Sequence, residues 1–184
     1  MDGQDGAKYK SFETKEEATK AFEKGYEHYL KTSSSSKAAA GLTPKAPVGK
    51  PIWESLCVDA ACSGNPGDME YRGVYPPTMQ EIFRIGPLKK GTNNIGEFLA
   101  LVHGLALLKQ KGSSLPIYSD SRNAIGWVKK KKCKTLLERV PENEPIFDMI
   151  ERAEKWLKTN TYTTPILKWE TSEWGEIPAD FGRK

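Results

Sequence analysis

The chain has 184 residues, of which 38% are hydrophobic and 10% aromatic, enough apolar material for one ordinary core and an appendage. No apolar run approaches the roughly 18 to 20 residues that span a bilayer, and the N-terminal sequence lacks the basic-then-apolar layout of a secretory signal, so we expect a cytoplasmic protein without a membrane partner. The net charge is +4, but residues 31–51 alone carry four lysines and no acid. An anionic partner must therefore be held by local patches rather than by overall charge.

Residues 1–51 do not look like a domain of their own. Residues 8–12 predict a short strand, and residues 14–30 predict a helix in which Thr14 and Glu17 form a capping pair. Residues 31–51 are rich in Ser, Ala, Pro and Lys and lack aromatic residues, which indicates a flexible linker. One strand and one helix are too small to be stable alone.

From residue 52 the chain alternates between strand and helix patterns. The predicted elements, in order, are strands at 52–63, 71–77 and 79–88, a helix at about 94–111, a strand at 115–120, helices at 121–132 and 145–160, and a strand at 164–170. Turn residues separate the first three strands, which indicates an antiparallel meander. The order as a whole predicts an α/β fold with a mixed sheet and helices on its faces. The three cysteines, Cys57, Cys62 and Cys133, suggest neither a disulfide framework nor a zinc site.

Four acids stand where a charge is costly unless it has a function. Asp59 ends the first strand, just before the turn SGNPG, and Glu97 lies in the first turn of a helix, beside the face that turns toward the sheet. Asp120 ends a strand at the edge where open α/β sheets hold their ligands. Asp180 follows the last strand and what we expect to be a short polar loop.

Carboxylates gathered at one sheet end repel one another unless a cation neutralises them. Oxygen ligands without nearby histidines suit Mg²⁺ or Mn²⁺, and a pair of such ions roughly 3.5–4 Å apart is a common device for hydrolysing phosphodiesters. Each acid alone has a structural explanation as a turn former or a helix cap. Together they favour a metal site.

Four ordered segments resemble the motifs of type 1 ribonucleases H, namely VDAACSGNPG, TNNIGEF, YSDSRNAIGWV and IPADFGRK. The resemblance implies a ribonuclease H-like fold for residues 52–184, with a five-stranded mixed sheet flanked by helices, an antiparallel meander of the first three strands, and parallel fourth and fifth strands. It also implies an endonuclease that hydrolyses the RNA strand of RNA/DNA hybrids with two Mg²⁺ ions, for which Mn²⁺ can substitute. We expect the protein to be a monomer.

The resemblance also implies roles for single residues. The positions that match the family's metal-binding catalytic acids are Asp59, Glu97, Asp120 and Asp180. Asn65, Asn93 and Asn94 match residues that contact the hybrid in its minor groove, where amides can donate to 2′-hydroxyls and accept from base edges. Helix capping is an alternative role for Asn93 and Asn94, and both roles can hold together.

The lysine run at residues 129–134 could hold phosphates of the DNA strand, with Lys129 and Lys130 as the chosen candidates, or it could form a solvated surface. On a helix these lysines point in several directions, so only some of them can face one duplex. We expect Trp127 and His103 to be packing residues.

Residues 1–30 resemble part of the small hybrid-binding domain that precedes many such enzymes. Its first half is absent, so we expect packing or disorder rather than hybrid binding for Tyr9, Lys10 and Phe12. The predicted organisation is therefore a partial segment at 1–30, a linker at 31–51 and a catalytic domain at 52–184.

The catalytic region departs from the family at three points. Ala60 stands where Gly is common, and no histidine precedes the last acid, where Glu173 or Glu176 could substitute in part or simply form a solvated acidic loop. Only four residues follow Asp180, so we expect this acid to be held less firmly than the others.

Two other functions are compatible with this fold. An inactive hybrid-binding module is one, but the intact set of acids argues against it. A nuclease that acts on DNA is the other, but the GNPG and TNN segments favour RNA recognition.

Overall fold

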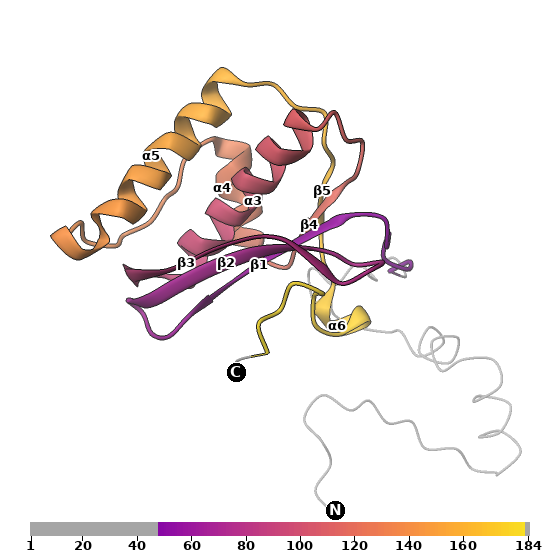
Figure 1. Ribbon diagram of the computed structural model, residues 1–184, viewed down its shortest axis with the longest axis horizontal. Coiled ribbons are helices and arrows are strands. Elements are labelled where there is room, and N and C mark those ends of the chain that lie inside the picture. The colour runs from indigo at the N-terminus through magenta and orange to yellow at the C-terminus, as the bar shows by residue number, and fades with distance from the viewer. Residues whose placement is uncertain (1–47, 183–184) are drawn as a thin grey trace, which may run out of the picture. The chain divides into compact units, whose positions relative to one another are not determined.

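The computed structural model describes residues 48–182, which contain one five-stranded sheet. The sheet strands are β1 (Leu56–Cys62), β2 (Gly67–Tyr75), β3 (Gln80–Gly91), β4 (Ile117–Ser119) and β5 (Ile166–Lys168). The helices are α3 (Asn93–Gln110), α4 (Arg122–Lys130), the 3-10 helix η1 (Pro141–Asn143), α5 (Glu144–Thr159) and α6 (Thr171–Trp174). Figure 1 shows α3, α4 and α5 on one side of the sheet, and α6 with the C-terminal segment on the other.

The sheet has the predicted topology. Its strand order is β3-β2-β1-β4-β5, with antiparallel pairing of β1 with β2 and of β2 with β3, and parallel pairing of β4 with β1 and with β5. Because β1 and β4 are parallel neighbours, their carboxyl ends meet at one edge. The predicted α/β fold with an antiparallel meander and two parallel strands is confirmed.

The main core lies between the sheet and helix α3. Leu56, Val58 and Ala60 point from β1 toward the helices, and Phe98, Leu101 and Leu105 of α3 are fully buried against them. Trp127 and His103 belong to this packing, as predicted: Trp127 meets Phe98 edge-to-face, and His103 stacks on Phe83. The central helix is thus anchored over the first two strands.

A second, smaller core covers the opposite face of the sheet. It consists of Cys57, Val74, Tyr118, Trp169, Ile177 and Ala179. The indole N–H of Trp169 donates to the carbonyl of Gly175 at 2.9 Å, and the indole of Trp174 donates to the carbonyl of Gly49 at 2.8 Å. Apolar side chains therefore pin the segment before Asp180 to the sheet.

The prediction of a short polar loop before Asp180 is wrong in part. Residues 171–174 form the short helix α6, and Ile177 and Ala179 are buried. Exposed acids alternate with these apolar residues, so the segment reads as polar although it is amphipathic. Glu173 lies in α6 and is exposed, and Glu176 is exposed in the loop that follows.

The element boundaries shift by a few residues from the sequence prediction. Strand β2 begins at Gly67, directly after the turn, rather than at residue 71, and β3 extends to Gly91 because Gly67 and Gly91 pair in register. The turn is so tight that a Cβ atom on Gly67 would lie 2.5 Å from the amide nitrogen of Gly64. The glycines of SGNPG therefore make this close return possible.

The partial hybrid-binding-like segment at 1–30, with Tyr9, Lys10 and Phe12, lies outside the described residues, as does most of the predicted linker. Within residues 48–182, none of the helices is long and apolar enough to cross a membrane. The three cysteines are free thiols, and burial raises the pKa of Cys57 and of Cys133 to about 12. Cys57 and Cys133 are therefore protonated at neutral pH.

Candidate metal centre

Three of the four predicted acids converge at the carboxyl edge of the sheet. Asp59, Glu97 and Asp120 each offer one carboxylate oxygen, and these three oxygens lie within 4.8 Å of one another. Asp59 lies in the middle of β1 rather than at its predicted end, because the strand continues to Cys62; Asp120 follows β4, and Glu97 lies just after the first turn of α3 rather than in it. Parallel pairing of β1 with β4 brings the two aspartates together, and α3, which packs on the sheet, places Glu97 beside them.

The position of Glu97 depends on two features of α3. A Cβ atom on Gly96 would lie 2.7 Å from Cβ of Ala60, so only glycine lets the helix approach β1 this closely. The side-chain amide of Asn93 then donates to Oε1 of Glu97 at 2.9 Å. Helix α3 thus begins with Asn93 and Asn94 of the TNN segment, and Asn93 orients Glu97. The capping role itself belongs to Thr92, whose side chain accepts a hydrogen bond from the amide of Ile95 at 3.3 Å.

All four predicted acids line one hollow of about 330 Å³, together with Asn93. Asp180 belongs to the segment after α6, and this segment lies on the side of the sheet opposite to α3 (Figure 1). It is not a member of the close cluster that the other three acids form. The hollow is therefore bounded by acids from four distant parts of the sequence.

Burial and mutual repulsion make two of these acids hard to ionise. Burial, followed by the charge of Asp120 and then those of Glu97 and Asp180, raises the pKa of Asp59 to about 8, against a lowering by the backbone amide of Ala60. Burial and the charge of Asp120 raise the pKa of Glu97 to about 7, although hydrogen bonds from Ser121 and Asn93 lower it. A divalent cation would relieve this repulsion, and the all-oxygen donor set fits a hard ion such as Mg²⁺ or Mn²⁺.

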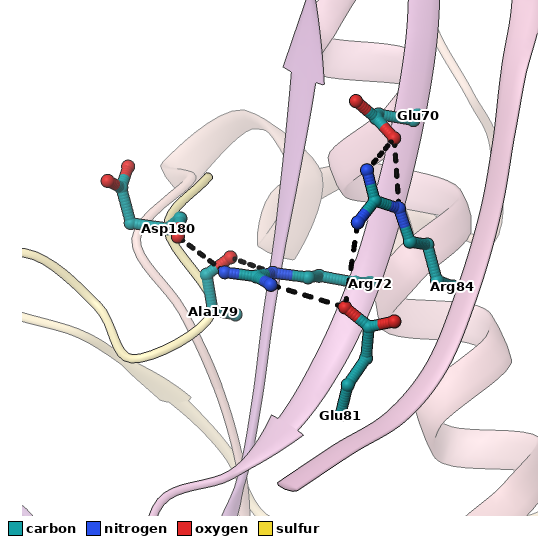
Figure 2. A network of polar contacts seen from close by, with 6 residues as sticks. All are labelled: Glu70, Arg72, Glu81, Arg84, Ala179 and Asp180. Atoms are coloured by element: carbon teal, nitrogen blue, oxygen red, sulfur yellow. Dashed lines mark hydrogen bonds and ion pairs between the residues drawn. The ribbon is translucent and has the colours of Figure 1, made fainter. Parts of the chain in front are cut away.

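The main chain around Asp180 is held by an arginine that the sequence did not single out. Figure 2 shows Arg72 of β2 between the C-terminal segment and Glu81 of β3. Its Nε donates to the carbonyl of Ala179 at 2.8 Å, and its Nη2 donates to the carbonyl of Asp180 at 2.6 Å. The Asp180 carboxylate points away from Arg72, and its Oδ2 accepts from the amide of Gly182 at 2.9 Å.

The predicted substrate contacts are only partly gathered at the hollow. Asn65 lies exposed in the turn between β1 and β2, and Asn94 is exposed in the first turn of α3. Neither of them lines the acidic hollow within the described part of the chain, whereas Asn93 does. Their contacts with a substrate remain a prediction.

The lysine run divides into surface and structural residues. Lys129 and Lys130 are exposed in the last turn of α4, and Lys129 lines a separate hollow of about 340 Å³ with Arg122 and Lys168. Lys132 instead pairs with the buried carboxylate of Glu154 at 3.1 Å. The expectation that only some of these lysines are available for one duplex agrees with this division.

Sequence reasoning missed Ser121 and Arg72 as supports of the site. Ser121 lies directly after Asp120 and caps α4 by accepting from the amide of Ala124 at 3.1 Å, so its place in the YSDS segment was the available signal. Arg72 had no such signal, because it lies outside the four motifs and its partners near Asp180 are main-chain carbonyls.

Comparison with known proteins identifies the family of the chain. The family profile described as RNase H matches residues 54–168, more than half of the chain. The chain belongs to the ribonuclease H family. Ribonuclease H of Rhodopirellula baltica is 41% identical to it over 75 residues, which cover 40% of this chain and 46% of that protein. The chain thus spans about half the length of this relative.

Ribonuclease H of Rickettsia bellii is 31% identical to this ribonuclease H family member over 137 residues, which cover 68% of this chain and 83% of the relative. Among solved structures, RNase H1 from the halophilic archaeon Halobacterium salinarum matches with a TM-score of 0.40 and 19% sequence identity, over 65% of this chain and 86% of that one.

Proposed function

We propose that this ribonuclease H family member hydrolyses the RNA strand of RNA/DNA hybrids endonucleolytically by a two-metal-ion mechanism. The observation that carries the proposal is the convergence of Asp59, Glu97 and Asp120 within 4.8 Å, with Asp180 lining the same hollow. Mg²⁺ is the proposed ion and Mn²⁺ its substitute, because the donors are all carboxylate oxygens.

When bound, the two cations supply an activated water and stabilise the leaving oxygen of the phosphodiester. The protein's part is to hold them, through Asp59, Glu97, Asp120 and Asp180. Asn93 keeps Oε1 of Glu97 in place at 2.9 Å, so the glutamate enters the site pre-oriented. Asp59 and Glu97 must release their protons to bind a cation, and their raised pKa values place this release near neutral pH.

Amide side chains suit the recognition of the RNA strand. Asn65, Asn93 and Asn94 can each donate to and accept from a 2′-hydroxyl or a base edge. Asn93 uses one amide hydrogen on Glu97, which leaves its carbonyl oxygen and its second hydrogen for substrate. Lys129 and Lys130 are proposed to contact phosphates of the DNA strand. We further propose that the protein acts as a monomer in the cytoplasm.

Cleavage of a labelled RNA/DNA hybrid, compared with duplex DNA and duplex RNA with and without Mg²⁺, tests the substrate. We expect Mg²⁺-dependent cuts within the RNA strand of the hybrid alone. Equal cleavage of duplex DNA would indicate a DNA nuclease of the same fold, and binding of the hybrid without any cleavage would indicate an inactive binding module.

The variant Asp120→Asn tests the site. Removing one of three clustered carboxylates should abolish cleavage, with a loss of at least about 10³-fold, because cation binding depends on the set. Binding of the hybrid, measured by fluorescence anisotropy, should change less than about threefold, since phosphate contacts dominate affinity. Turnover retained at saturating Mg²⁺ would contradict the proposal.

A further inference from the structure

We infer that Arg72 is a positioning residue that fixes Asp180 at the acidic hollow by holding its main chain. One guanidinium donates to two successive carbonyls, from Nε to Ala179 at 2.8 Å and from Nη2 to Asp180 at 2.6 Å. The same group stacks on the ring of Phe181, at 4.7 Å from the ring centroid. Arg72 thus contacts three consecutive residues centred on the acid, two of which, Ala179 and Asp180, are drawn in Figure 2. The inference rests on the proposed function, because it assigns Asp180 a role in that reaction.

Asp180 needs such an anchor because no strand or helix carries it. The part of the segment after α6 that the structure describes has no regular secondary structure, and the amide of Asp180 bonds locally, to the carbonyl of Ile177 at 2.8 Å. Two bonds from one rigid, planar group fix both the position and the direction of a peptide. Arg72 holds the segment through main-chain oxygens, and the Asp180 carboxylate points away from Arg72.

The anchor is itself tied to the metal centre through the sheet. Arg72 lies in register with Asp59 on the neighbouring strand, so one strand pair carries both the first acid and the holder of the last. Its Nη1 donates to Oε2 of Glu81 on β3 at 3.2 Å. Displacement of Arg72 would therefore move Asp180 relative to Asp59, and a shift of about 1 Å at a reacting centre can cost on the order of 10²-fold in rate.

Arg84 provides a matched control on the same surface. Its guanidinium carbon lies 5.3 Å from the centroid of the Phe181 ring, the same ring that Arg72 contacts. Arg84 also pairs with the buried carboxylate of Glu70 at 2.6 Å. Its recorded hydrogen bonds within residues 48–182 go to Glu70 and not to the carbonyls of Ala179 or Asp180. Arg84→Gln therefore removes a neighbouring positive charge, a ring contact and the ion pair with Glu70, but keeps the two bonds from Arg72 to the carbonyls.

The first measurement is amide hydrogen exchange in the full chain without metal. The amides of Asp180 and Gly182 are the reporters, because both are hydrogen-bonded, to Ile177 and to Oδ2 of Asp180. In Arg72→Gln they should exchange at least about tenfold faster, while amides of β1 and α3 stay unchanged, since the loss of an anchor opens only the segment it holds. Arg72→Lys should show most of this increase, because one ammonium cannot reproduce the planar fork. Arg84→Gln should stay within about threefold of the wild type.

The second measurement is steady-state cleavage of a hybrid with Mg²⁺. Arg72→Gln should lower kcat at least about tenfold and change KM less than about threefold, because the substrate contacts remain. Unchanged exchange at Asp180 and Gly182 would overturn the inference, as would faster exchange with a normal kcat. Equal losses in Arg84→Gln and Arg72→Gln would overturn it too. If the wild type fails to cleave hybrids, the proposed function fails, and the exchange rates still decide whether Arg72 holds the segment.

Discussion

Asp59 and Glu97 are carboxylic acids placed where ionisation is unfavourable. They are only 7% and 8% exposed, and each faces Asp120 across the hollow. Water cannot solvate these charges well, and the neighbouring acids repel them, so the pKa of Asp59 rises to about 8 and that of Glu97 to about 7. The protein therefore keeps a site that is unfavourable by itself and becomes favourable when a divalent cation takes the place of protons.

This electrostatic strain predicts how stability depends on pH. In the metal-free protein the folded state holds protons that the unfolded state has released above about pH 4, so the free energy of unfolding should fall as pH rises from about 5 to 8. Excess Mg²⁺ should flatten this slope, because the ion binds only the folded site. Urea unfolding at several pH values, with chelator or with Mg²⁺, measures both effects.

Other groups titrate in the same range, so the variant Asp59→Asn serves as the reference. Its metal-free form should lose the Asp59 part of the slope between pH 5 and 8, keep the part from Glu97, whose pKa is raised by burial and Asp120, and gain little from Mg²⁺. A wild-type stability that rises with pH in the presence of chelator would contradict the assignment of raised pKa values.

At the scale of elements, helix α3 packs closely against strand β1. Thr92 caps its start, Asn93 orients Glu97, and Gly96 allows contact with Ala60 of β1. Ala60, a departure from the glycine common in the family, is accommodated because the residue opposite it is Gly96. The two small residues together set the distance between the strand that carries Asp59 and the helix that carries Glu97.

Gly96→Ala should therefore destabilise the fold. The added methyl would lie 2.7 Å from Cβ of Ala60, and such overpacking costs about 1–3 kcal/mol in the free energy of unfolding. Gly126→Ala in α4 is the control, because a Cβ atom there meets nothing within 4 Å, and it should stabilise the helix by up to about 1 kcal/mol. Guanidinium unfolding measures both. Equal stability of the Gly96→Ala variant and the wild type would show that α3 can move away from β1 freely.

At the scale of the whole described region, the sheet brings acids to one edge and leaves basic residues in separate places. The acids gather because β1 and β4 are parallel and because α3 and the C-terminal segment reach the same edge from opposite faces. Lys129 and Lys130 lie at the end of α4, with Arg122 and Lys168 beside Lys129. Lys132 forms an ion pair with Glu154. This division separates candidate phosphate contacts from structural lysines.

Hybrid binding by Asp120→Asn, the variant that we expect to be inactive, should weaken steeply with salt. Adding Lys129→Gln should reduce the slope of log K against log salt concentration by about 1, the effect of one lost phosphate contact. Adding Lys132→Gln instead should leave the slope unchanged, because this lysine pairs with Glu154. Fluorescence anisotropy at several salt concentrations gives both slopes. A flat salt dependence would argue against lysine contacts with phosphates.

The sequence by itself determined the elements and the identity of the acids. Asp120 directly follows β4 and Glu97 lies near the start of α3, as local patterns predict, whereas Asp59 lies within β1 and not at its end; strand order with parallel pairing then brings these positions together. The structure added features that depend on packing between distant residues, namely helix α6 and the burial of Ile177. Ile177 is buried because it packs on the face of the sheet opposite to α3, and the local sequence does not show this contact.

Arg72 is the clearest case of what only the tertiary structure decided. Its hydrogen bonds to Ala179 and Asp180 join residues 107 and 108 positions apart, and they go to main-chain carbonyls, which every residue possesses. No residue type or spacing in the sequence can therefore mark its partners. The motifs are short-range patterns of side chains and can be read in order, whereas an anchor between a strand and a distant backbone exists only once the sheet has placed them side by side.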